Sequence, residues 1–271
     1  MSTDLQTQHT TIPVQGPVPE MKAYVATPGG QPRPALIVIH EAFGLDSHIE
    51  DMTRRFAGEG YVAVAPDLFS ADEVGRTISP DEIKEIFRLR SSLPADQRRD
   101  PDALNRAIDK LSPDKAERLR AVVQWQQNRD NSRFVTLLEE TVAWCRNRSD
   151  TTEKVGAVGF CMGGGLVSAL AFAGADIQAG APFYGQNPPL DQAGQVRCPL
   201  LFIYGRNDPF IMPGVPKLLT TLEDAKLTYG LHIYEEAGHA FMNDARPEMY
   251  NGAAAKDAWP LTLAFFDRHL S

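Results

Sequence analysis

Residues 155–173 read VGAVGFCMGGGLVSALAFA, and this stretch indicates the fold more clearly than any other. Its first part is apolar, as in a strand that is buried on both faces of a parallel sheet. Its last part is rich in small residues and is typical of a tightly packed helix. The GFCMG turn between them, residues 159–163, matches the G-x-S-x-G pattern of a strand–turn–helix elbow, with Cys161 at the serine position. The stretch therefore predicts a parallel sheet with Cys161 at a sharp turn.

The rest of the chain alternates between strand-like and helix-like segments. The predicted strands are residues 21–26, 35–40, 61–65, 155–160, 177–184, 199–204 and 227–234. The predicted helices are residues 48–59, 133–146, 163–173, 215–224 and 253–270. Such alternation is typical of βαβ units, so we expect a doubly wound, mostly parallel sheet with helices on both faces.

The length of 271 residues suits one α/β domain that spans the whole chain. Residues 1–20 are polar, and we expect them to pack loosely. Residues 71–132 are crowded with charges and broken by prolines, which predicts a helical insertion with short helices at 81–90, 102–111 and 112–127. An ordered segment of this length is usually functional, most often as a cap over a site, although a decorative insertion is the alternative.

Composition narrows the class of protein. A net charge of −8 argues against a large nucleic-acid-binding face, while leaving room for a small basic pocket. The longest apolar runs have strand length and fall far short of the roughly 20 residues of a membrane helix. The polar N-terminus does not resemble a signal peptide. Three cysteines, at 145, 161 and 198, match neither a disulfide framework nor a zinc pattern, so we expect a cytoplasmic enzyme with free thiols.

Three residues in separate loops have the types and the order of a catalytic triad. Cys161 precedes a helix, whose dipole favours the thiolate, and the amide of Met162 is a natural oxyanion donor. Asp208 and His239 each follow a predicted strand. Either could be a structural residue on its own. Nucleophile, acid and histidine in this order are nevertheless the arrangement of hydrolases with a cysteine or serine elbow.

The loop HEAFG, residues 40–44, carries a further signal. It follows the predicted strand at 35–40, where such hydrolases place the second oxyanion amide. Glu41 is unusual in this loop, because a carboxylate would repel a developing oxyanion or a thiolate. A glutamate that simply faces solvent is the alternative interpretation.

The segments HEAFGL, GFCMGG, GRNDPF and AGHAF together resemble the dienelactone hydrolase (carboxymethylenebutenolidase) family of the α/β-hydrolase superfamily, from about residue 20 to the C-terminus. The resemblance implies an α/β-hydrolase fold and a catalytic triad of Cys161, His239 and Asp208. It also implies that Glu41 contacts the resting thiol and keeps it protonated until substrate displaces the carboxylate. The implied oxyanion donors are the amides of Ala42 and Met162.

The chain departs from this family at the expected substrate site. Well-known members hold a substrate carboxylate with two arginines, one of them a few residues beyond the catalytic histidine, where this chain has Asn243. The identity of the substrate, and whether it is anionic, is therefore open. Candidate substrate contacts are Phe43, Arg88, Arg90, Tyr184, Arg206, Phe241 and Asn243, with Arg246 as a further substitute for the missing arginine.

The function expected from the sequence is hydrolysis of a small-molecule ester or lactone through a thioester on Cys161, without a metal or an organic cofactor. Because a thiolate is also a good leaving group, lactones with enol leaving groups should react faster than simple esters. A broader carboxylesterase or thioesterase, an enzyme acting on haloacyl compounds, and a non-catalytic binding or thiol-redox protein are the alternatives. We expect no nucleic-acid or membrane partner, and the sequence does not indicate an oligomeric state.

Overall fold

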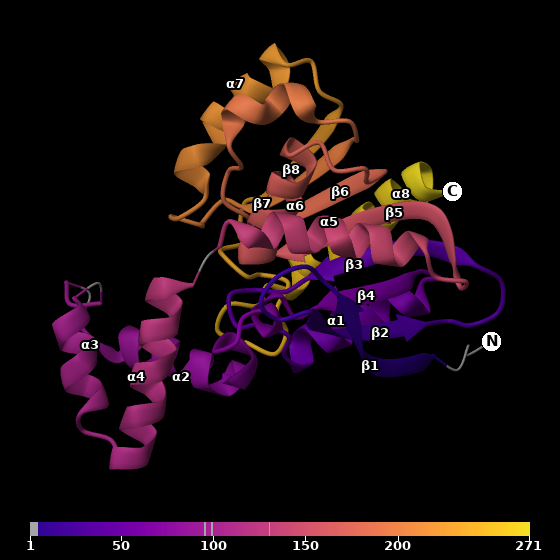
Figure 1. Cartoon of the computed structure of the whole chain (residues 1–271). Coiled ribbons are helices and arrows are strands. Elements are labelled where there is room, and N and C mark those ends of the chain that lie inside the picture. Colours follow the sequence, from indigo (N-terminus) through magenta and orange to yellow (C-terminus); the bar gives the residue numbers. More distant parts are fainter. Residues whose placement is uncertain (1–4, 95, 99, 130) are drawn as a thin grey trace.

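The computed structural model describes residues 5–94, 96–98, 100–129 and 131–271. One eight-stranded sheet runs through the described chain (Figure 1). Its strands are β1 (Gln6–Pro13), β2 (Glu20–Thr27), β3 (Arg33–Ile39), β4 (Val62–Pro66), β5 (Thr151–Phe160), β6 (Ala179–Phe183), β7 (Leu200–Gly205) and β8 (Tyr229–Tyr234). The helices around it are α1 (Ser47–Gly58), α2 (Pro80–Ser92), α3 (Pro101–Ile108), α4 (Pro113–Asn128), α5 (Arg133–Arg146), α6 (Met162–Phe172), α7 (Val215–Asp224) and α8 (Gly252–Leu270).

The sheet is mostly parallel, as the sequence predicts. Its strand order is β1-β2-β4-β3-β5-β6-β7-β8, with β1 and β2 antiparallel to their neighbours and all later pairs parallel. The apolar run of β5 is explained by helices on both faces. Val155 and Ala157 pack into the core layer beneath α5, α6 and α7, whereas Val158 and Phe160 pack into the layer beneath α1 and α8.

The strand order reverses between β3 and β5. The chain proceeds from β3 to β4 on one side and from β5 to β6 on the other. In open α/β sheets a ligand crevice forms at such a point, outside the carboxyl ends of the strands. Glu41 follows β3 and Cys161 follows β5, so both stand at this crevice. Asp208 and His239 follow β7 and β8 at the same edge of the sheet.

The N-terminal segment differs from the sequence-based prediction. Residues 6–13 do not pack loosely but form β1, which pairs in register with β2, for example Thr10 with Ala23. Ile12 is fully buried, while most of the strand is exposed. An edge strand has only one neighbour and shows polar side chains to solvent, so its composition does not distinguish it from a loop. Residues 1–4 of the predicted segment lie outside the described residues.

The predicted helical insertion contains α2, α3 and α4, which pack on one another and project away from the sheet (Figure 1). Proline at the first turn starts each of them, and Ser79 and Glu82 form a reciprocal capping box at α2. Two contacts connect α2 to the loop after β3. Lys84 pairs with Asp46 at 2.7 Å, and the ring of Phe87 lies 5.0 Å from that of Phe43.

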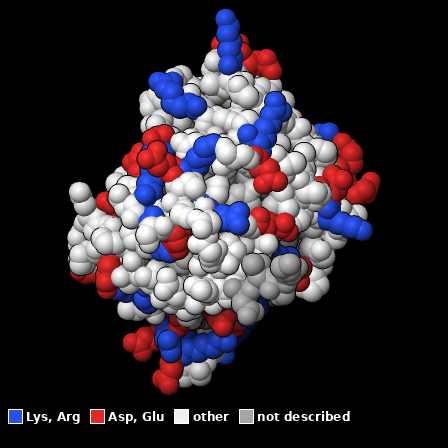
Figure 2. Space-filling view, turned by 90° about the vertical axis from the view of Figure 1, so that its right-hand side faces the viewer, with Lys and Arg blue, Asp and Glu red and all other residues white. Residues whose placement is uncertain are grey.

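Charges of both signs are mixed on the surface. On the face that Figure 2 shows, lysines and arginines lie among aspartates and glutamates. Across the described ranges of the chain, no helix has the length and apolar character to cross a membrane.

Candidate active site

Cys161 occupies a strained elbow between β5 and α6. Its φ of 55° and ψ of −113° are backbone angles that L residues rarely adopt, and its N–H donates to the Phe183 carbonyl at 3.1 Å. Close backbone contacts surround the turn. A Cβ at Gly159 would lie 2.3 Å from the Gly163 oxygen, and a Cβ at Gly163 would lie 2.3 Å from the Ile39 oxygen. Both flanking positions therefore require glycine.

The two predicted oxyanion amides belong to residues beside Cys161. Met162 is the first residue of α6, so its N–H has no acceptor within the helix. Ala42 comes from the loop after β3, and both residues line the same cavity as Cys161. The close approach of Gly163 to the end of β3 holds the elbow against this loop.

Asp208 and His239 form a tight pair at the ends of β7 and β8. Asp208 is buried, and its Oδ2 lies 2.6 Å from Nδ1 of His239. Its other oxygen accepts the backbone N–H groups of Phe210 and Ile211 at 3.0 and 3.2 Å. Both oxygens of the carboxylate thus take part in hydrogen bonds, and the carboxylate fixes the orientation of the imidazole.

The imidazole of His239 is held by Asp208 and lines the same cavity as Cys161. Burial alone would lower the pKa of His239, but hydrogen bonds to Asp208 and Cys161, together with negative charge on both, raise it to about 10. The ring also packs against Tyr184, with centroids 5.2 Å apart. A histidine in this position can hold a proton next to the sulfur atom.

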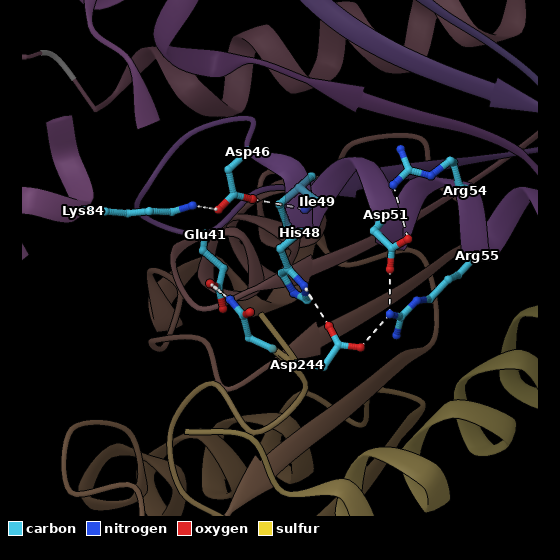
Figure 3. Close-up of polar contacts among 10 residues, drawn as sticks. Glu41, Asp46, His48, Ile49, Asp51, Arg54, Arg55, Lys84 and Asp244 are labelled. Carbon is cyan, nitrogen blue, oxygen red and sulfur yellow. Dashed lines mark hydrogen bonds and ion pairs between the residues drawn. The ribbon is translucent and has the colours of Figure 1, made fainter. Parts of the chain in front are cut away.

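Glu41 lies inside the protein and does not face solvent. It is 2% exposed, and one of its oxygens accepts from Asn243 Nδ2 at 2.7 Å. Burial, opposed by this hydrogen bond, raises the pKa of Glu41 to about 7, and the negative charge of Asp46 adds to the increase. Figure 3 shows Glu41 beside Asp46, whose carboxylate pairs with Lys84. Glu41 can therefore change its charge near neutral pH.

Two buried neighbours complete the surroundings of Glu41. The His40 ring lies between the Glu41 carbonyl, 2.7 Å from Nδ1, and the Leu68 N–H, which donates to Nε2. This pairing fixes the tautomer with the proton on Nδ1 and anchors the loop. Tyr184 is fully buried with a positive φ of 38°. Burial, and then negative charge at Glu41 and Cys161, raise the pKa of Tyr184 far above its ordinary value.

A cavity of about 580 Å³ opens in front of Cys161. Its walls come from the elbow, from the insertion and from the loops after β6 and β7. Its apolar lining includes Phe87, Phe134, Leu166, Ala169 and Ile211, and its polar lining includes Arg129, Asn131, Gln186, Asn187 and His239. The cavity therefore joins the predicted nucleophile to a mainly apolar chamber with a few polar groups.

Comparisons with known proteins agree with this geometry. The model of the dienelactone hydrolase family matches residues 21–270. The chain belongs to this family. A relative from Saccharolobus solfataricus, named "Putative carboxymethylenebutenolidase", is 34% identical over 92% of this chain and 94% of its own length. An Escherichia coli K12 protein of the same name is 29% identical over 96% of this chain and 86% of its own length.

A solved structure supports the same assignment. The crystal structure described as "Putative Dienelactone Hydrolase", from Klebsiella pneumoniae subsp. pneumoniae, is 27% identical and has a TM-score of 0.70, covering 97% of this chain and 98% of its own. The predicted α/β-hydrolase fold and family are thereby confirmed. This member of the dienelactone hydrolase family is a hydrolase that acts on small-molecule esters or lactones.

Most of the predicted substrate contacts lie away from the cavity of this dienelactone hydrolase family member. Arg88 pairs with Glu85 on the outside of α2, and Arg90 lines a different cavity. Arg206 is exposed and pairs with Glu235. None of these three arginines is among the residues that line the cavity in front of Cys161.

The remaining predicted contacts divide into two groups. Tyr184 lines the cavity. Phe43, Phe241 and Asn243 are buried behind it, and Asn243 is engaged by Glu41. Arg246 stacks 5.4 Å from the Phe43 ring and pairs with Glu248. Asn243, which stands where well-known members have an arginine, therefore donates a hydrogen bond to Glu41 in this chain.

Sequence reasoning missed Arg129, the one arginine among the described residues that line the cavity. It follows α4 in a short polar connection, where an arginine is unremarkable. Two of its contacts, Phe69 and Met162, are distant in the chain, and only the tertiary structure brings them to Arg129. Among the described residues, no three His, Cys, Asp or Glu side chains gather as a metal site.

Proposed function

We propose that this hydrolase cleaves its ester or lactone through a triad of Cys161, His239 and Asp208, with a thioester on Cys161 as the intermediate. The observation that carries the proposal is the His239 ring, whose Nδ1 lies 2.6 Å from Asp208 Oδ2 and which lines the same cavity as Cys161. The strained elbow presents the sulfur to the 580 Å³ cavity. Nucleophile, base and orienting acid are the three parts that acyl transfer requires.

In the first half-reaction the Cys161 thiolate attacks the carbonyl carbon. A C–S bond forms, and the carbonyl electron pair moves to the oxygen, which the Ala42 and Met162 amides stabilise. The C–O bond to the leaving group then breaks. The departing oxygen takes a proton from His239, whose raised pKa keeps that proton available.

In the second half-reaction water attacks the thioester. Once Cys161 is acylated, its negative charge no longer raises the pKa of His239, so the ring can act as a base. His239 takes a proton from the water as the C–O bond forms. The C–S bond then breaks, the acid product leaves, and the thiolate–imidazolium pair is restored.

Glu41 acts in this proposal as the gate of the thiol. While ionised, its buried carboxylate opposes negative charge at the neighbouring sulfur, which keeps the resting thiol unreactive. Its hydrogen bond from Asn243 holds the side chain in place at 2.7 Å. A substrate that displaces the carboxylate would remove this restraint, and the thiol would then give its proton to His239, which forms the thiolate–imidazolium pair that starts the first half-reaction.

The test compares Cys161→Ala with wild type on an enol lactone and on p-nitrophenyl acetate. The proposal predicts a loss of at least about 1000-fold in kcat for both substrates. It also predicts that wild type prefers the enol lactone to an ethyl ester, because a thiolate expels an enolate more readily than an alkoxide. Hydrolysis at the wild-type rate by Cys161→Ala would refute the proposed nucleophile.

A carboxylesterase of broader specificity is a second candidate, and the size of the cavity favours it. About 580 Å³ is in the range that accommodates drug-sized ligands. Equal kcat/KM values for bulky aryl esters and for a small lactone would support this candidate, and a strong preference for the lactone would exclude it. A cytoplasmic location and chemistry without a cofactor stay predictions from the sequence.

A further inference from the structure

Arg129 is a cation without a counter-ion in the described part of the chain. Its Nε and Nη1 atoms are buried and have no hydrogen-bond partner there, and its Nη2 has only the Met162 sulfur at 3.9 Å. Other arginines of the insertion pair with acids, for example Arg118 with Glu82 at 2.8 Å. Burial lowers the pKa of Arg129, and no charged group among the described residues raises it, although a guanidinium remains cationic at neutral pH.

Aromatic rings hold this guanidinium in place. Its central carbon lies 4.8 Å from the Phe69 ring, 5.1 Å from Trp125 and 5.8 Å from Phe134. Trp125 is itself fixed, since its indole N–H donates to Asp72 at 2.9 Å. Cation–π contacts of this kind orient the planar group without neutralising its charge. Arg129 is therefore preorganised for an anion.

The environment of Arg129 indicates which kind of ligand would carry that anion. Arg129 lines the cavity that also contains Cys161 and His239. A partly buried cation without a partner is costly, and a carboxylate is the partner that arginine binds best, through two parallel hydrogen bonds. Much of the wall between these groups is apolar, with Phe134 and Leu166 among its residues. A ligand that spans the cavity would thus be apolar in its middle and anionic at one end.

We propose that Arg129 is a specificity-determining residue that binds the carboxylate of a bulky, mainly apolar ester or lactone. The carboxylate would lie on the side of the cavity formed by the insertion, where Arg129 stands. The inference rests on the proposed function for its chemistry, but its binding step does not depend on hydrolysis. It also gives the insertion a role, because Arg129 follows α4 directly.

The kinetic test uses matched pairs of substrates. Mono-p-nitrophenyl esters of dicarboxylic acids with four to eight carbons are compared with p-nitrophenyl esters of monocarboxylic acids of the same length. Wild type should favour the anionic ester at the longer lengths, despite the net charge of −8 of the protein. Equal or lower kcat/KM for every anionic ester would overturn the proposal without any variant.

Variants then assign the preference to Arg129. In Arg129→Gln the ratio of kcat/KM for the anionic ester to that for the neutral ester should fall about 10- to 100-fold, mainly through KM, as expected for a lost charge-assisted hydrogen bond. Arg129→Lys keeps the charge and should retain part of the ratio. The matched control is Arg118→Gln, which removes an exposed arginine of the same insertion and should leave the ratio unchanged. An equal fall for both esters in Arg129→Gln would indicate a merely structural role.

A binding measurement separates this inference from the proposed function. Calorimetry on Cys161→Ala with the non-hydrolysable monoamide of the preferred dicarboxylic acid should show binding that the added Arg129→Gln substitution weakens about 10-fold or more. If the amide binds more weakly after Arg129→Gln, the role of Arg129 is supported. If Cys161→Ala also hydrolyses esters at the wild-type rate, the proposed triad is refuted while the role of Arg129 stands. Hydrolysis that depends on Cys161, with the same amide affinity in both proteins, would refute Arg129 alone.

Discussion

At the residue scale, the charge of Glu41 is the most sensitive property of the site. The carboxyl is buried, and its pKa is raised from the ordinary 4.5 to about 7. The folded protein therefore keeps this proton to a higher pH than the unfolded chain does. It follows that Glu41 lowers the free energy of unfolding progressively as the pH rises from about 4.5 to about 7.

Glu41→Gln should remove this penalty. The amide can still accept the hydrogen bond from Asn243, and it stays neutral at every pH. We expect the variant to match wild type near pH 4.5 and to exceed it by up to about 3 kcal/mol at pH 8. Urea unfolding at both pH values measures the difference. If the variant is less stable than wild type at pH 8, the ionised carboxylate of Glu41 does not lower the free energy of unfolding, contrary to this prediction.

The same substitution tests the gate. Burial raises the pKa of Cys145 and of Cys198 to about 12, so iodoacetamide at pH 6 to 8 should report mainly on Cys161. Below pH 7 Glu41 is neutral, and Glu41→Gln should react at about the wild-type rate. Above pH 7 the wild-type carboxylate is charged, so the variant should react faster than wild type. A rate ratio that does not change with pH would contradict the gate.

The sequence predicts the residue types of the site better than their contacts. Cys161, Asp208 and His239 are recognisable because each follows a strand, in a fixed order along the chain. Arg129 could not be found in this way, because it follows no strand and because Phe69 and Met162, which are distant in the sequence, contribute to its surroundings. For Asn243, the sequence shows only that an expected arginine is absent. Its hydrogen bond to Glu41 is visible only in the structure.

At the element scale, the elbow depends on glycines that touch backbone. A methyl group at Gly163 would lie 2.3 Å from the Ile39 carbonyl oxygen, whereas one at Gly165 would meet its nearest atoms, in Gln186, at 3.4 Å. Gly163→Ala should therefore lower the free energy of unfolding by about 2–3 kcal/mol or more. Gly165→Ala is the matched control in the same helix, and its effect should stay within about 1 kcal/mol.

Chemical denaturation of both variants measures this contrast. Equal stabilities would mean that the elbow can move away from β3, and the close packing would then not be what fixes Cys161. The element scale is also where sequence periodicity predicts best. α5 and α7 begin and end at the predicted residues, because apolar stripes and breaks mark them. β1 was missed because an exposed edge strand has little apolar pattern.

At the scale of the whole molecule, an ion pair of low exposure connects the insertion to the loop after β3. Lys84 of α2 pairs with Asp46, whose side chain is only 5% exposed. Lys84→Ala should leave this carboxylate buried and unpaired, and we expect a loss of about 1–3 kcal/mol in the free energy of unfolding. Lys115→Ala breaks a more exposed pair within the insertion and should cost less than about 1 kcal/mol.

Thermal unfolding and limited proteolysis of the two lysine variants would measure this attachment. Faster cleavage within residues 80–128 in Lys84→Ala, but not in Lys115→Ala, is the expected result. Identical cleavage of both would show that α2 is held to the sheet by other contacts, such as the stacking of Phe87 on Phe43.

The most direct test of the central claim is the intact mass of the protein during turnover of a p-nitrophenyl ester. In His239→Ala, where the thioester lacks its base, the mass should increase by one acyl group, and peptide mapping should place that group on Cys161. The same experiment with Cys161→Ala should show no increase. Ester turnover by wild type, together with an acyl group on another residue or sustained turnover by Cys161→Ala, would contradict the account.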